Sequence, residues 1–158
     1  MNKFDNILIT GGAGYVGSHI VEKLVKTNAN IFILDNLVTG HKELINKKAI
    51  FIKGDIGDIP KVRNIIIKND INSIIHLAAN LNIKEAEKNK RKYNLNNIKG
   101  TLKLIKACKN LNIQNIIFSS SCSVYGSVNG SVTEKTKLNP QGYYAYTKFK
   151  GEQIVKEY

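Results

Sequence analysis

Asn-Ile-Leu-Ile-Thr-Gly-Gly-Ala-Gly-Tyr-Val-Gly, residues 6–17, is the stretch that decides the fold. A short apolar segment runs into a cluster of glycines, and an amphipathic segment follows to about residue 26. This order is typical of a strand, a tight turn and a helix. The glycines are spaced G-x-G-x-x-G, so the backbone can approach a pyrophosphate and the helix can pack closely on the strand. The N–H groups that begin such a helix bind phosphate, and the stretch therefore predicts a phosphate-binding turn.

An aspartate ends the next apolar segment. Residues 30–35 read Asn-Ile-Phe-Ile-Leu-Asp, which predicts a second strand with Asp35 at its tip. A carboxylate there accepts hydrogen bonds from the hydroxyls of an adenosine ribose and repels a 2′-phosphate, so the sequence favours NAD over NADP. The alternative is a purely structural glycine turn with a capping aspartate. It explains less well why the glycine motif lies between a strand and a helix and why Asp35 ends the next strand.

Apolar segments alternate with amphipathic segments along the rest of the chain. The expected strands are 6–10, 30–35, 49–53, 73–77 and 115–119, and the expected helices are 15–26, 59–69, 93–110 and 142–158. Such alternation predicts an α/β fold with a doubly wound, Rossmann-like parallel sheet of about five strands and helices on both faces. We expect one NAD-binding domain over residues 1–158.

Composition excludes several classes of protein. No apolar run reaches the roughly 18 residues of a membrane span, and the N-terminus shows no secretory signal. Two cysteines, Cys108 and Cys122, make neither a disulfide framework nor a zinc pattern, which fits a reducing cytoplasm and predicts no metal site.

The net charge of +12 raises the question of nucleic-acid binding. The basic residues are spread along the chain, and arginine, which reads bases and phosphates best, occurs only at Arg63 and Arg91. We therefore expect no nucleic-acid partner. The densest basic stretch, Lys84 to Lys92, is interpreted as a solvated helix face.

Two segments carry groups suited to acid–base chemistry. Residues 119–126 read Ser-Ser-Ser-Cys-Ser-Val-Tyr-Gly and follow the last expected strand, at the sheet edge where ligands bind. Tyr144 and Lys148 are four residues apart and share one face of a helix. A cation beside a phenol favours the phenolate, so we expect the pKa of Tyr144 to fall from its usual value of about 10 toward neutrality. A tyrosine so tuned is a general base.

These segments together resemble the extended short-chain dehydrogenase/reductases and, within them, the UDP-glucose 4-epimerases. The resemblance rests on motifs spread through nearly the whole chain. They are Thr-Gly-Gly-Ala-Gly-Tyr-Val-Gly-Ser-His at 10–19, Leu-Asp-Asn-Leu at 34–37, Gly-Asp-Ile at 54–56, His-Leu-Ala-Ala at 76–79, Asn-Asn-Ile-Lys-Gly-Thr at 96–101, the serine-rich strand end, and Pro140, Tyr144 and Lys148.

The resemblance implies a set of cofactor-binding residues and a reaction. NAD would be bound by Gly11, Gly14, Tyr15, Val16, Gly17, Asp35, Asn36, Asp55, Ile56, Leu77, Ala78, Ala79, Asn96, Ser119, Tyr144 and Lys148. Ser121 and Tyr144 would contact the 4-hydroxyl of a UDP-hexose, and Lys148 would bind the nicotinamide ribose. Tyr144 would take the 4-hydroxyl proton while NAD takes the C4 hydride. The 4-keto sugar would then turn over and receive the hydride on its other face.

Other reactions of the same family need groups that this chain lacks. The 4,6-dehydratases carry an Asp-Glu pair where this sequence has Cys122 and Ser123, and the decarboxylases usually keep a glutamate at the second position. Epimerase chemistry needs no extra acid and is favoured. A decarboxylase or reductase, or an NAD-binding module without catalysis, remains an alternative. Two departures concern cofactor retention: Leu81 stands where epimerases often have a lysine, with Lys84 nearby, and the usual proline before Tyr93 is missing.

Family members also carry a second half of similar size, which completes the sheet and clamps the nucleotide. We therefore expect residues 1–158 to hold the redox apparatus without the substrate domain, as a fragment, a truncated product or one half of a split enzyme. The isolated chain should turn over poorly, because catalysis depends on holding the sugar against the nicotinamide. The resemblance also implies a homodimer formed through helices 93–110 and 143–158.

Overall fold

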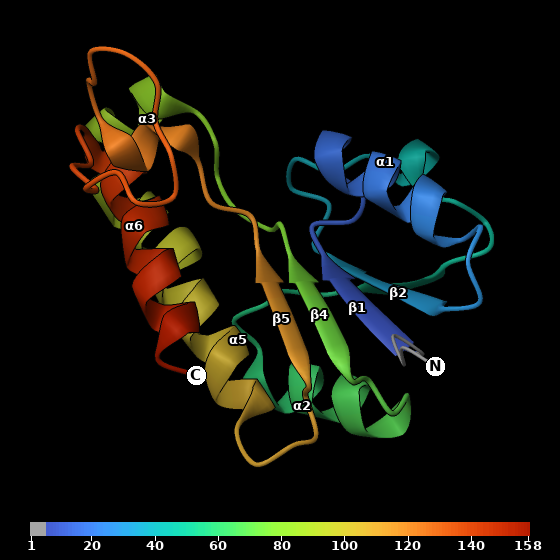
Figure 1. Cartoon of the computed structure of the whole chain (residues 1–158). Coiled ribbons are helices and arrows are strands. Elements are labelled where there is room, and N and C mark those ends of the chain that lie inside the picture. Colours follow the sequence, from blue (N-terminus) through green and yellow to red (C-terminus); the bar gives the residue numbers. More distant parts are fainter. Residues whose placement is uncertain (1–5) are drawn as a thin grey trace. The chain divides into compact units, whose positions relative to one another are not determined.

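A computed structural model of the chain describes residues 6–158, and one parallel sheet organises it (Figure 1). The sheet consists of β1 (Asn6–Thr10), β2 (Asn30–Asp35), β3 (Ile50–Lys53), β4 (Ser73–His76) and β5 (Asn115–Phe118). The strand order is β3-β2-β1-β4-β5, with every pair parallel. The chain thus runs from β1 to one edge and then returns to build the other, which is the doubly wound, Rossmann-like order. The predicted fold class is confirmed.

The described chain divides into two compact units. Unit 1 comprises the residues up to Ala78 together with Lys103–Ser119, and it contains the sheet. Unit 2 comprises Ala79–Leu102 and Ser120–Tyr158 and is mainly helical. The single domain expected over residues 1–158 stays a prediction.

Helices cover both faces of the sheet within unit 1. The helical segments of this unit are α1 (Tyr15–Leu24), the 3₁₀ turn η1 (Lys42–Leu44), α2 (Ile59–Lys68) and most of α5 (Thr101–Cys108). Val21 of α1 packs on Ile7 and Ile9 of β1, whereas Leu8 lies in the opposite layer with Leu104 of α5. Because successive residues of a strand point to opposite faces, the apolar strands are buried on both sides, as in a covered parallel sheet.

Unit 2 packs short helices against one long helix. Its elements are α3 (Ile83–Lys88), α4 (Lys90–Tyr93), the π-helix η2 (Asn94–Gly100), the start of α5, the 3₁₀ turn η3 (Cys122–Tyr125) and α6 (Tyr143–Lys156). Ala86, Tyr93 and Tyr144 form its buried cluster. The lysines of α3 and α4 are exposed, as expected for a solvated face. No helix over residues 6–158 is long and apolar enough to cross a membrane.

The prediction of one regular helix over residues 93–110 is wrong for the interior of that segment. Residues 94–100 form a π-helix between α4 and α5. The hydroxyl of Thr101 donates to the carbonyl oxygen of Asn97 at 2.6 Å. A side-chain donor that satisfies a helical carbonyl competes with the regular backbone pattern, and Gly100 adds conformational freedom at the same place. The other predicted strands and helices end within two residues of the observed ends.

Candidate active site

The glycine turn after β1 is too tight for side chains at two positions. Gly11 has φ +74°, and a Cβ there would lie 2.8 Å from the backbone nitrogen of Ala78. A Cβ on Gly17 would lie 2.2 Å from the carbonyl oxygen of Gly11. The Gly11 N–H donates to the carbonyl of Leu34 on β2, which pins the turn to the sheet. The backbone of the helix start lies so close to the backbone of the turn that only glycine fits at position 17.

The first turn of α1 lies directly behind this glycine turn. Gly14 is its N-cap residue, and no side chain caps the helix start. Tyr15 and Val16, the first two residues of the helix, are 78% and 54% exposed. Uncapped N–H groups at a helix start bind anions. The local geometry of Gly11, Gly14 and Gly17 thus fits a diphosphate.

Asp35 is buried at the carboxyl end of β2 and holds two backbone groups. Its Oδ2 accepts from the N–H of Ala13 at 3.1 Å, and its Oδ1 accepts from the N–H of Leu37 at 2.8 Å. Two ionised carboxylate oxygens offer about four acceptor positions. The side chain therefore keeps acceptor capacity for the hydroxyls of a ribose while it orders the glycine turn.

Asn36 and Asp55 meet beyond the ends of β2 and β3. The Asn36 amide donates to Asp55 Oδ2 at 3.0 Å, and Asp55 Oδ1 accepts from the N–H of Gly57 at 2.7 Å. The side chain of the next residue, Ile56, packs in the hydrophobic core. Of these two expected NAD-binding residues, Asp55 and Ile56, only Asp55 thus presents its side chain at this edge.

A buried polar pair that the sequence reasoning missed fixes the ends of β1 and β4. Thr10 Oγ1 and His76 Nδ1 are 2.7 Å apart, and both residues are buried. Thr10 also accepts from the N–H groups of Leu77 and Ala78, and the His76 carbonyl accepts from Ser119. Each residue is a polar end of an otherwise apolar strand, a pattern that marks the two residues in the sequence but not their pairing. The pair holds three expected cofactor residues at the carboxyl edge of the sheet.

Unit 2 brings together the three expected catalytic side chains. Ser121 makes a hydrogen bond with the Tyr144 hydroxyl, and Lys148 lies one turn further along α6. Tyr144 and Lys148 are only 9% and 3% exposed. The structure therefore pairs the serine of the strand end with the tyrosine of the helix.

Burial dominates the acid–base properties of these groups. It raises the pKa of Tyr144 above its ordinary value, and the hydrogen bond from Ser121 opposes this only in part. It lowers the pKa of Lys148 to about 8. The expected lowering of the Tyr144 pKa by Lys148 is thus not found: removal of the phenol from water is the largest influence on this pKa, followed by the Ser121 hydrogen bond and the charge of Cys122.

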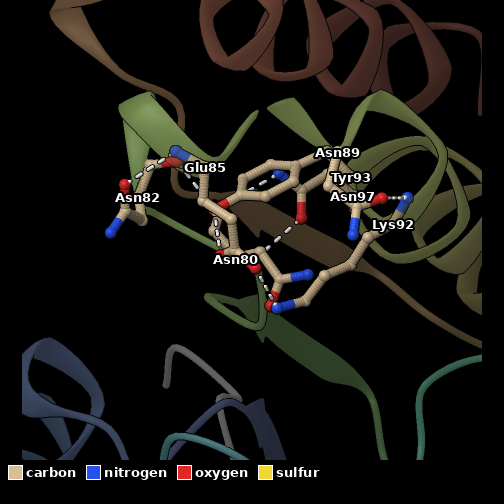
Figure 2. A network of polar contacts seen from close by, with 7 residues as sticks. All are labelled: Asn80, Asn82, Glu85, Asn89, Lys92, Tyr93 and Asn97. Atoms are coloured by element: carbon tan, nitrogen blue, oxygen red, sulfur yellow. Dashed lines mark hydrogen bonds and ion pairs between the residues drawn. The ribbon is translucent and has the colours of Figure 1, made fainter. Parts of the chain in front are cut away.

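Asn97 joins α6 to the segment that follows β4, and Figure 2 draws its bonds with Asn80 of that segment. Its side-chain nitrogen donates to Asn80 O at 3.0 Å and to Thr147 Oγ1 at 3.1 Å, and its Oδ1 accepts from the N–H of Asn80 at 2.8 Å. Thr147 Oγ1 in turn donates to the carbonyl of Tyr144 at 2.7 Å. Asn97 is 3% exposed, so these bonds are made out of water. Sequence reasoning singled out Asn96 and missed this neighbour.

We expect Asn97→Leu to lower the free energy of unfolding by roughly 2–4 kcal/mol, because it leaves several buried partners unpaired. Chemical denaturation of the full chain measures the effect. Asn94→Leu, in the same π-helix, is the matched control, since the side chain of Asn94 makes one long contact among residues 6–158, at 3.4 Å to the Tyr143 hydroxyl. Equal losses in the two variants would contradict the role of Asn97.

The side-chain oxygen of Asn96 is buried and has no hydrogen-bond partner among the described residues. Buried polar atoms of native proteins are nearly always paired, and leaving one unpaired costs about 1–3 kcal/mol. An acceptor of this kind fits a donor from a bound cofactor. Together with the tight, uncapped glycine turn, it shows that each unit separately has features suited to NAD.

A second polar network stiffens the helices that precede η2 (Figure 2). The Tyr93 hydroxyl donates to Asn82 O at 2.7 Å and lies 3.1 Å from a carboxylate oxygen of Glu85. Lys92 pairs with the same carboxylate at 2.5 Å. The bonds from Lys92 and Tyr93 lower the pKa of Glu85, and burial with the Glu85 bond raises the pKa of Tyr93. Leu81, which stands where the epimerases often have a lysine, is 64% exposed and directly precedes Asn82 of this network.

Comparison with known proteins gives a consistent result. The family model described as "NAD dependent epimerase/dehydratase family" matches residues 7–158. The UDP-glucose 4-epimerase of Lactobacillus helveticus is 39% identical over 150 residues, which are 94% of this chain and 46% of that protein. The putative UDP-glucose 4-epimerase of Methanocaldococcus jannaschii is 40% identical over 154 residues, which are 96% of this chain and 50% of that protein.

Solved structures agree with these sequence matches. The UDP-glucose 4-epimerase of Brucella ovis in complex with NAD superposes with a TM-score of 0.93 at 35% identity, over 98% of this chain and 47% of that one. The chain thus spans about half the length of the relatives that it matches.

Proposed function

Because this chain belongs to the NAD dependent epimerase/dehydratase family, we propose that it supplies the NAD-binding and acid–base part of a nucleotide-sugar 4-epimerase. The proposed substrates are UDP-glucose and UDP-galactose. The observation that carries the proposal is the hydrogen-bonded pair of Ser121 and Tyr144, with the buried Lys148 one turn away.

Each side chain has a distinct proposed task. When bound, NAD supplies a reversible hydride acceptor for the sugar C4. Tyr144 takes the proton of the 4-hydroxyl and later returns it, while the single O–H of Ser121 donates a hydrogen bond to the phenolate. Lys148, with a pKa of about 8, is largely charged at pH 7, so it binds the ribose hydroxyls and favours the phenolate.

Two neighbours of Ser121 argue for epimerisation over the related eliminations. Dehydration needs an acid to protonate the departing C6 hydroxyl and a base to remove the C5 proton. Cys122 and Ser123 stand at the relevant positions, and the Ser123 hydroxyl is turned onto Ser121 at 2.8 Å. Neither group does that work at neutral pH, so a reaction that needs only one acid–base residue is preferred.

The proposed activity needs the part of the relatives that lies beyond the matched half. We propose that a C-terminal half supplies the UDP-hexose site. We also propose a homodimer formed through helices 93–110 and 143–158, and a cytoplasmic location. Support comes from the shared length of the match and from the relatives named UDP-glucose 4-epimerase.

The experiment is a turnover assay with UDP-galactose, using the full 158-residue chain with and without a supplied C-terminal half of a relative. We expect turnover only in the mixture. Tyr144→Phe should keep NAD binding, as followed by fluorescence titration, and lose turnover at least about a hundredfold. Tyr146→Phe is the matched control, because Tyr146 lies on the same helix and is 40% exposed. Unchanged turnover in Tyr144→Phe would refute the mechanism.

A further inference from the structure

The serine-rich segment after β5 contacts α6 at two positions along the helix. Ser121 bonds to Tyr144, and the Ser120 hydroxyl donates to a carboxylate oxygen of Glu152, two helical turns further along. Lys148 lies midway between Tyr144 and Glu152, four residues from each. Residues four apart on a helix share one face. The two serines therefore fix the helix on either side of the lysine.

The charge of Glu152 acts on a lysine that is almost fully withdrawn from water. Lys148 is 3% exposed, and burial alone disfavours its ammonium form. Glu152 opposes this effect by raising the pKa of Lys148. Its carboxylate is itself half-buried and oriented by Ser120, so its interaction with the lysine is less screened than that of an exposed pair.

Charged groups on the elements packed against α6 are engaged elsewhere or exposed. Glu85 pairs with Lys92, and Glu87 accepts from the N–H of Tyr143. Cys122 raises the pKa of Tyr144 through a charge interaction. The remaining cations of α3, α4 and η2 are exposed: Lys84, Lys88, Lys90, Arg91 and Lys99. Glu152 is a carboxylate whose charge raises the pKa of Lys148.

We propose that Glu152 is a positioning residue, oriented by Ser120, whose negative charge keeps Lys148 in its ammonium form at neutral pH. The proposal deepens the proposed function, because it concerns the lysine assigned to the nicotinamide ribose and the phenolate. A group with a pKa of about 8 is about 90% protonated at pH 7. Loss of a nearby opposite charge lowers such a value by about one unit or more, which would leave half or less of Lys148 charged.

The test measures the ionisation of Lys148 directly. The full chain is labelled with trace acetic anhydride at a series of pH values, and the labelling of Lys148 and Lys156 is quantified by peptide mass spectrometry. We expect Glu152→Gln, which keeps a partner for Ser120, to shift the titration of Lys148 down by about one pH unit. Glu157→Gln, at the exposed C-cap position just after the same helix, should leave the titration unchanged. The titration of Lys156 is an internal reference.

Ser120→Ala provides a second variant that removes the orienting bond but keeps the charge. We expect a smaller downward shift of Lys148 in this variant, with the far-ultraviolet circular dichroism of all three variants unchanged. Equal titrations of Lys148 in Glu152→Gln and Glu157→Gln would overturn the proposal, as would a shift of Lys148 upward in either Glu152→Gln or Ser120→Ala.

The readout separates this inference from the proposed function. Labelling needs neither substrate nor a supplied C-terminal half. A downward shift in a chain that never supports epimerisation would leave the role of Glu152 standing and refute the function. Epimerisation without any shift in the titration of Lys148 would support the proposed function and refute the role of Glu152.

Discussion

Gly17→Ala is expected to lower the affinity of the chain for NAD by at least about a hundredfold and to destabilise the fold by roughly 1–3 kcal/mol. The new Cβ would lie 2.2 Å from Gly11 O and 2.7 Å from Gly12 Cα, and both of these atoms belong to backbone. Backbone cannot rotate away as a side-chain end can, so the start of α1 must move off the turn. The uncapped N–H groups of the helix would then no longer point to the place where a diphosphate binds.

Gly14→Ala is the matched comparison for stability. A Cβ at Gly14 meets only the carbonyl oxygen of Gly11 at 3.3 Å, a contact that a small adjustment relieves. Urea denaturation should therefore show a markedly smaller loss for this variant than for Gly17→Ala. Isothermal titration with NAD measures the affinity of the stable variants. Equal destabilisation at the two glycines would show that steric fit at Gly17 is not the cause.

Lys148→Met is expected to abolish turnover in the reassembled enzyme and yet to stabilise the chain by roughly 1–3 kcal/mol at pH 7. The folded pKa of Lys148 is about 8, below the ordinary 10.5, so the folded state binds its proton more weakly than the unfolded state. The lysine therefore weakens the fold most below pH 8, and the free energy of unfolding rises between pH 8 and 10.5. Methionine has a similar length and no charge to desolvate.

Chemical denaturation at pH 7 and at pH 10 measures the size and the sign of the change in the free energy of unfolding that Lys148→Met causes. The advantage of Lys148→Met over the unsubstituted chain should shrink as the pH rises toward 10.5. Lys156→Met, on the exposed end of the same helix, should change stability by less than about 0.5 kcal/mol at either pH. A loss of stability in Lys148→Met at pH 7 would mean that partners of the ammonium contribute more than its burial costs.

The sheet was predictable because its strands are short, apolar and separated by amphipathic helices. β1 and β2 begin and end at the predicted residues, and the glycine turn with Asp35 follows from motif and spacing. Membership of the predicted family is confirmed by the family model over residues 7–158. The roles of the individual site residues stay predictions.

The features that were missed depend on contacts between residues far apart in the chain. The bond between Thr10 and His76 joins two strands, and the bond between Ser120 and Glu152 joins a loop to a helix. No periodicity in one segment encodes such pairs. The pKa of Tyr144 was likewise misjudged, because a pattern of residues predicts neighbours but not how far a phenol is withdrawn from water.

The π-helix has a consequence for how this protein tolerates insertions and deletions. A π-turn accommodates one more residue than the α-helical turn that it replaces. Deleting any one residue of 94–100 would allow a regular α-helix whose flanking helices keep nearly the same relative rotation, so the change would fall on the directions in which the side chains of the segment itself point. Asn97 could then no longer meet Asn80 and Thr147 together. The length of this segment is therefore constrained more strictly than the identity of exposed positions such as Leu95 and Lys99.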